Sequence, residues 1–165
     1  MPILLCRVDD RLIHGQVVVG WGAKLGIDYI AVVDDDLAAS EWEQELYRAG
    51  LPDEVEARFA TVDEAADSIS AWKADDSRGF ILTRDIGTMR RLAERGALAG
   101  IAVNLGGLHD APGRDRVFPY LYLSDADREE LERLRRLEVE VSARDVPSAR
   151  KVGIDELLDP GADRS

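Results

Sequence analysis

The chain has 165 residues, of which 45% are hydrophobic and 33% charged, and its formal net charge is −12. This length predicts a single domain over residues 1–158, followed by a frayed tail at 159–165. The acidic balance argues against nucleic-acid binding, no apolar run approaches the roughly 20 residues that span a bilayer, and a lone cysteine excludes an internal disulfide, so a cytoplasmic protein without direct membrane insertion is expected.

Strand-like and helix-like segments alternate along the chain. The candidate strands are residues 3–8, 29–33, 55–60, 79–83, 100–104, 117–123 and 138–143. Most are continuous apolar runs, typical of strands covered on both faces, whereas the last alternates valine with glutamate and predicts one exposed face. The pattern predicts an α/β fold, an open, mainly parallel, doubly wound sheet of about six to seven strands with helices on both faces.

Three helix starts carry the spacing of a capping box. Ser40, Thr61 and Ser124 each stand three residues before an acidic residue. In the helix expected over residues 124–137, the leucines at 131, 134 and 137 are predicted to share one buried face. The tryptophans at 21, 42 and 72 are interpreted as packing residues.

The segment after the first strand concentrates ionisable groups and reads Arg7-Val-Asp-Asp-Arg-Leu-Ile-His14-Gly-Gln-Val17. In an open α/β sheet, ligands bind beyond the carboxyl ends of the strands, where a helix N-terminus favours a phosphoryl group. His14 is therefore predicted to accept a phosphoryl group as the neutral imidazole. Asp9 or Asp10 is expected to accept a hydrogen bond from one ring N–H and so to fix the free nitrogen.

The same segment supplies groups for the phosphoryl oxygens. Arg7 and Arg11 are suited to neutralise the negative charge on a phosphoryl group during its transfer. Which of them contacts the phosphate is left open. Gly15 allows close approach to backbone N–H groups. The scheme requires neither a metal nor a cofactor. The alternative interpretation is an exposed loop histidine among surface Asp–Arg pairs.

A long loop after the fifth strand begins Asn104-Leu-Gly-Gly107. Because it also leaves the carboxyl end of a strand, Asn104, Gly106 and Gly107 are expected to form a second wall of the site. His109, further along this loop, could approach His14, but a solvated loop histidine is the favoured interpretation.

Other kinds of site receive less support. Asp34-Asp-Asp36 could hold Mg²⁺, but acidic residues at a helix start are the simpler interpretation. A phospho-aspartate receiver domain needs an aspartate at the end of its third strand and a lysine after its fifth, and neither is present there. The chain also has no dinucleotide-binding or P-loop motif.

The segment Arg7–Val17 closely resembles the active-site segment of the IIB components of the mannose/fructose/sorbose class of the bacterial sugar phosphotransferase system (PTS). The resemblance covers nearly the whole chain. Further matches in the same order are Trp21, residues 30–35, Val103-Asn-Leu-Gly-Gly107, Gly113-Arg114 and residues 137–147.

This resemblance implies a protein-phosphohistidine–sugar phosphotransferase. Such IIB components take a phosphoryl group from a IIA protein, hold it on a histidine and pass it to a sugar moved by the IIC and IID membrane components. The catalytic residues are then expected to be His14, Arg11 and Asp9, and the phosphate-binding residues Arg7, Gly15 and Gln16. The protein would associate peripherally with the membrane transporter and use a separate IIA polypeptide as donor.

Departures from the family pattern concern the second loop. Leu108 stands where the family typically has methionine, and Ala111-Pro112 replaces more polar residues. These changes leave the sugar and the fit to partners open. A regulatory phosphorelay or binding module, which would use the same phosphohistidine without sugar transport, is the alternative function.

Overall fold

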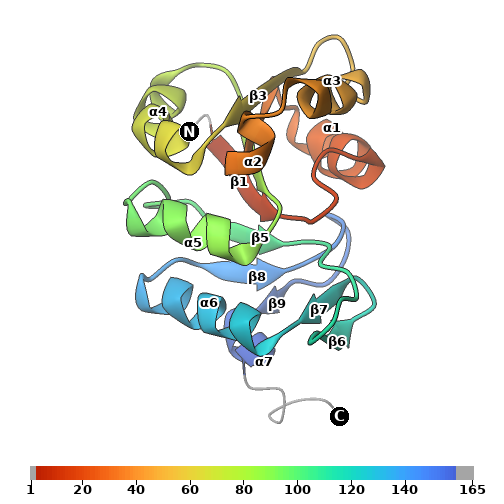
Figure 1. Ribbon diagram of the computed structural model, residues 1–165, viewed down its shortest axis with the longest axis vertical. Helices are drawn as coiled ribbons and strands as arrows, with labels where there is room; N and C mark the ends of the chain where they lie inside the picture. Colours follow the sequence, from red (N-terminus) through yellow and green to blue (C-terminus); the bar gives the residue numbers. More distant parts are fainter. Residues whose placement is uncertain (1–2, 159–165) are drawn as a thin grey trace.

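The computed structural model describes residues 3–158; the tail expected at 159–165 lies outside them (Figure 1). The strands are β1 (Ile3–Val8), β2 (Tyr29–Val33), β3 (Glu56–Ala60), β4 (Gly79–Thr83), β5 (Val103–Leu105), β6 (Asp115–Phe118), β7 (Leu121–Leu123), β8 (Val141–Ala143) and β9 (Val152–Gly153). The helices are η1, a π-helix (Gln16–Gly22), then α1 (Ala23–Leu25), α2 (Asp35–Ala38), α3 (Glu41–Ala49), α4 (Val62–Ala74), α5 (Ile86–Glu94), α6 (Asp125–Arg136) and α7 (Ile154–Leu158).

Seven strands form one sheet in the order β3-β2-β4-β1-β5-β8-β9. All neighbours in it are parallel except β8 and β9, which pair antiparallel. The expected mainly parallel, doubly wound α/β sheet is confirmed. β1 lies between β4 and β5, so the segment that leaves its carboxyl end is flanked by the ends of two further strands.

Side chains from both faces of the sheet are buried, as the continuous apolar strands predicted. Within β2, Tyr29, Ala31 and Val33 belong to one core with α4, α5 and α6, and Ile30 and Val32 to another with η1 and α2. Figure 1 shows α5 and α6 in front of the strands. Cys6 lies in the first core, and burial raises the pKa of its thiol to about 12.

Two of the three predicted capping boxes are confirmed. The side chains of Thr61 and Ser124 each accept a hydrogen bond from the backbone N–H three residues on. The acidic side chain at that position accepts one from the backbone N–H of the capping residue. Ser40 precedes α3 without a side-chain capping bond. Asp34 caps α2 through the Leu37 N–H. Within residues 3–158 no group of three or more metal-binding side chains comes together, and no helix is long and apolar enough to cross a membrane.

Three of the predicted strands are wrong in extent or kind. The strand predicted over 100–104 begins only at Val103, after Gly100 with a left-handed φ of 76°. Residues 117–123 do not form one strand, because the chain turns at Pro119-Tyr120 and folds β6 back on β7 as a separate hairpin. The strand predicted over 138–143 begins only at Val141 and is buried throughout. Before it, Glu138 adopts a left-handed φ of 61°, and the Val139 N–H still donates to the Leu134 carbonyl. The backbone conformation of these residues is therefore set by the end of α6.

Two apolar residues predicted to pack are exposed. Leu131 and Leu134 are fully buried, but Leu137 follows the end of α6 and is 42% exposed. Trp42 is 68% exposed on α3, whereas Trp21 is buried. The interpretation of Trp42 as a packing residue is therefore wrong.

Candidate functional site

His14 lies in the loop between β1 and η1, at the carboxyl edge of the sheet, and its side chain is 17% exposed. Its Nδ1 lies 2.8 Å from the carbonyl oxygen of Leu12. Because a carbonyl can only accept, Nδ1 carries the proton, and the neutral ring has its lone pair on Nε2. Leu12 adopts a left-handed φ of 56°, an uncommon conformation for leucine that makes this loop a strained one.

The Nε2 atom of His14 is buried and has no hydrogen-bond partner among the described residues. The Asp9 Oδ2 atom is 3.7 Å away, too far for a hydrogen bond. The expectation that Asp9 or Asp10 accepts the ring proton is therefore wrong in this conformation. One ring nitrogen is thus bonded to Leu12 and the other is covered in this conformation.

Arg7 and Asp9 form an ion pair beneath His14. The Arg7 Nη2 lies 3.1 Å from Asp9 Oδ2, and both side chains are fully buried. Burial lowers the pKa of the Arg7 guanidinium, while the Asp9 carboxylate opposes that change. Asp9 also accepts from the backbone N–H of Arg11 at 3.1 Å and of Gly107 at 3.3 Å. This carboxylate therefore fixes the His14 loop against the second loop.

The Arg7 guanidinium is fixed from several sides. Its Nη1 donates to the side-chain oxygen of Asn104 and to the carbonyl of Arg144, and its Nη2 also donates to the carbonyl of Asp145. The Trp21 ring lies 5.1 Å from its Cζ, a cation–π distance, and the Trp21 indole N–H donates to Asp145. These bonds make Arg7 a support for the loop and leave it no exposed donor.

Arg11 is the arginine of the motif that reaches solvent. Its side chain is 41% exposed, and its Nη2 donates to the Gln16 side chain at 2.7 Å. Its Nε lies 3.6 Å from Asp9. Gly15, between His14 and Gln16, is exposed, with open space where a Cβ would stand. Arg11, Gly15 and Gln16 are therefore accessible from solvent.

The carboxyl end of β5 brings the expected second wall, Asn104, Gly106 and Gly107, to the site. Arg7 and Asn104 are register partners on β1 and β5. Gly106 donates to the Val8 carbonyl, and Gly107 accepts from the Asp10 N–H at 2.8 Å. The N–H of Gly107 donates to the Asp9 side chain. The two loops are thus joined through both the N–H and the carbonyl of Gly107.

Gly106 is required by close packing. A Cβ at this position would lie 2.2 Å from the Arg7 Cζ, which is fully buried and cannot move aside. Gly106→Ala is expected to destabilise the fold by about 1–3 kcal/mol through overpacking. Gly15→Ala, with open space and a helical φ of −52°, is the matched control and is expected to retain wild-type stability. Urea unfolding of both variants tests this, and equal midpoints would contradict it.

A second histidine lies in the loop after β5. The His109 Nδ1 is 2.6 Å from Asp10 Oδ1, and the His109 backbone N–H donates to Asp10 Oδ2 at 2.8 Å. Sequence reasoning treated His109 as a solvated histidine and did not predict this pair. The two residues are separated by 99 positions, and only their shared location at strand ends, β1 for one and β5 for the other, could have indicated it.

Known proteins resemble this chain over most of its length. A sequence model of the family described as the PTS system sorbose subfamily IIB component matches residues 3–163. The chain belongs to this family. PTS IIB components are phosphotransferases that work with IIA and with IIC/IID components, and the predicted family, enzyme class and phosphoryl-carrier role in sugar uptake are confirmed.

Individual relatives of this PTS IIB component cover most of its length. The N-acetylgalactosamine-specific IIB component 1 of Escherichia coli K12 is 32% identical over 156 residues, which are 90% of this chain and 94% of that protein. Its crystal structure has a TM-score of 0.82 over 92% of this chain and 99% of that one. The E. coli mannose-specific EIIAB component is 29% identical over 158 residues, and the IIB chain spans 49% of it.

Proposed function

We propose that His14 is the phosphoryl-accepting residue of this PTS IIB component, taking the group from a phosphorylated IIA protein and passing it to a sugar moved by IIC and IID. The observation that carries the proposal is the placement of His14 beside Asp9, a buried carboxylate that pairs with Arg7 and also lies 3.6 Å from the accessible Arg11. Phosphoryl transfer depends mainly on positioning and on stabilisation of charge, and this arrangement supplies both.

The surrounding residues take separate roles in this proposal. Arg11 neutralises the phosphoryl oxygens, with Gln16 orienting its guanidinium and the Gly15 N–H within reach. Asp9 positions the loop, Arg7 holds Asp9, and Asn104 holds Arg7. We assign Arg7 this supporting role rather than phosphate contact, because its side chain is fully buried.

In this proposal His14 is the nucleophile in the first transfer and the leaving group in the second. The neutral ring of His14 attacks phosphorus after turning away from Leu12, and the N–P bond forms as the donor's N–P bond breaks. In the second step a sugar hydroxyl attacks the same phosphorus and the His14 N–P bond breaks. The sugar and the IIA, IIC and IID partners meet the chain at the carboxyl edge of the sheet, so we also place the protein at the membrane transporter.

The test uses radiolabelled phosphoenolpyruvate, the general relay proteins and candidate IIA donors. We expect acid-labile, alkali-stable label on the wild-type chain and none on His14→Ala. Membranes carrying IIC and IID, together with sugar, should then remove the label as sugar phosphate. Label that stays on the protein would favour a regulatory phosphorelay. No label, with the donors shown to be phosphorylated, would overturn the proposal.

A further inference from the structure

The Asp10–His109 pair joins the loop after β1 to the loop after β5, and the proposed mechanism does not use it. Both oxygens of one carboxylate are engaged, one by the His109 ring and one by its backbone N–H, at 2.6 and 2.8 Å. The His109 side chain is nevertheless 53% exposed. A histidine merely solvated on a loop would have no such double attachment, and the attachment leaves the ring oriented while its far edge is open.

The second loop is also fixed from its other side. Arg114 Nη1 donates to the His109 carbonyl at 3.0 Å, and its Nε donates to Asp127 Oδ2 at 3.2 Å. Asp127 belongs to the capping box that begins α6. His109 is therefore held between the β1 end and the α6 start, and its ring position is set by rigid elements.

The free edge of the His109 ring faces the same space as Arg11. Asp10 accepts the Nδ1 proton, which leaves Nε2 as the open ring nitrogen. The Cε1 atom next to it and the Arg11 Nη2 lie 3.4 and 3.5 Å from the position that a Cβ on Gly107 would occupy. The same point is 3.3 Å from Asp9 Oδ1, the carboxylate beside His14. Gly107 thus brings the His109 ring and the Arg11 guanidinium together at the site.

We propose that His109 is a second phosphoryl-binding residue, whose Nε2–H donates to an oxygen of the phosphoryl group on His14. Asp10 is the positioning residue that orients the ring. The inference rests on the proposed function of His14 and extends it. No bond to His109 forms or breaks; it contributes one hydrogen bond in both transfers.

Charged groups surround the proposed contact. Asp10 and Asp9 are the carboxylates that face the junction of the two loops, and Arg11 and Arg114 are the cations. A phosphoryl group on His14 adds negative charge, which an Nε2–H donor on His109 would meet.

The experiment measures phosphoryl transfer to His14 in the full chain from potassium phosphoramidate, a donor that requires no protein, and from a phosphorylated IIA protein. The variants are His109→Ala, His109→Gln, which keeps an N–H donor that does not titrate, and Asp10→Asn. Asp110→Asn, an exposed carboxylate next to His109, is the matched control. The His109 ring is followed by ¹H–¹⁵N NMR before and after phosphorylation.

We expect His109→Ala to slow transfer from both donors about tenfold, with His109→Gln recovering part of the rate. The His109 Nε2–H resonance should shift on phosphorylation in the wild type, less so in Asp10→Asn, and as in the wild type in Asp110→Asn. An unchanged Nε2–H resonance, or equal rates in His109→Ala and wild type, would overturn the inference. Labelling by phosphoramidate but not by IIA would instead contradict the proposed function alone, and failure of both donors would overturn both.

Discussion

Asp9→Ala is expected to lower the free energy of unfolding by about 3–5 kcal/mol, the cost of leaving a buried charge without its partner. Arg7 is fully buried and keeps its other bonds to carbonyls and to Asn104, none of which carries a negative charge. The variant also removes the acceptor for the N–H groups of Arg11 and Gly107. Urea unfolding measures the loss.

Two further variants isolate the charge. Asp115→Ala removes an exposed carboxylate from β6 and is expected to change stability by no more than about 0.5 kcal/mol. Arg7→Met combined with Asp9→Ala removes both charges and should cost less than the sum of the two single changes. A loss from Asp9→Ala as small as that of Asp115→Ala would show that the buried ion pair does not stabilise the loop.

Arg11→Ala is expected to slow phosphoryl transfer to His14 by about 100- to 1000-fold, in analogy with the removal of one donor from an oxyanion site. Arg11 is the accessible arginine of the motif, so its loss leaves the phosphoryl oxygens without that cation. The unfolding midpoint should stay close to wild type, because the side chain is 41% exposed. Single-turnover transfer from a phosphorylated IIA protein measures the rate.

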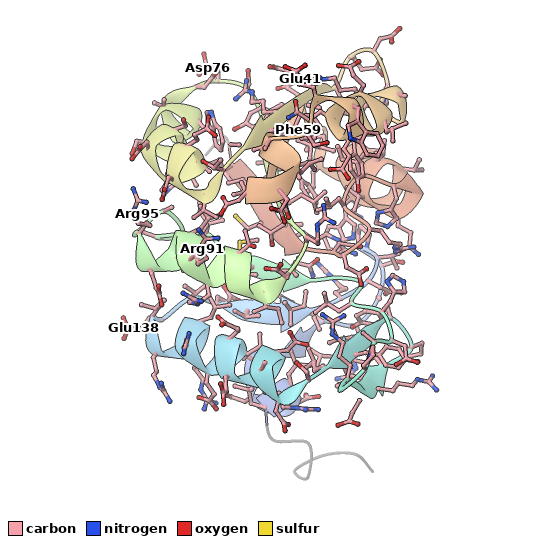
Figure 2. The ribbon with its side chains drawn as sticks, viewed as in Figure 1. Glu41, Phe59, Asp76, Arg91, Arg95 and Glu138 are labelled. Carbon is pink, nitrogen blue, oxygen red and sulfur yellow. The ribbon has the colours of Figure 1, made fainter. Side chains whose placement is uncertain are left out.

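The controls separate local charge from net charge. Arg11→Lys keeps the charge but lacks the forked geometry, and should recover part of the rate. Arg95→Ala removes an equally exposed arginine that pairs with Asp63 and Asp67, and Figure 2 shows it beyond α5, at the edge of the molecule. That variant should transfer at the wild-type rate. Transfer by Arg11→Ala at the rate of Arg95→Ala would remove Arg11 from the mechanism.

The parts of the fold that were predicted well are those where local and tertiary preferences agree. β2 and β4 have the predicted bounds because both faces of these strands are buried, so their apolar runs are continuous. Residues 138–140 were wrongly predicted as strand because their alternating pattern competed with the end of a helix. The hydrogen bond from Val139 to Leu134 forms there, and no period in the sequence reveals it.

The chemistry of the motif could be predicted from its residues, but its internal geometry could not. Arg7 and Arg11 look equivalent in the sequence, and only the register of β1 with β5 shows that Arg7 is buried against Asn104. The partner of the His14 ring is a backbone carbonyl presented by a left-handed leucine, a conformation that leucine does not signal.

The double attachment of Gly107 to Asp9 and Asp10 has a thermodynamic consequence for the relay. The two loops share these bonds, so a partner or sugar that shifts the loop after β5 also changes the energy of the loop that carries His14. By reciprocity, the phosphoryl group then alters the affinity for that partner by the same factor. Binding partners would thus distinguish the phosphorylated chain from the unphosphorylated chain through the hydrogen bonds of Gly107.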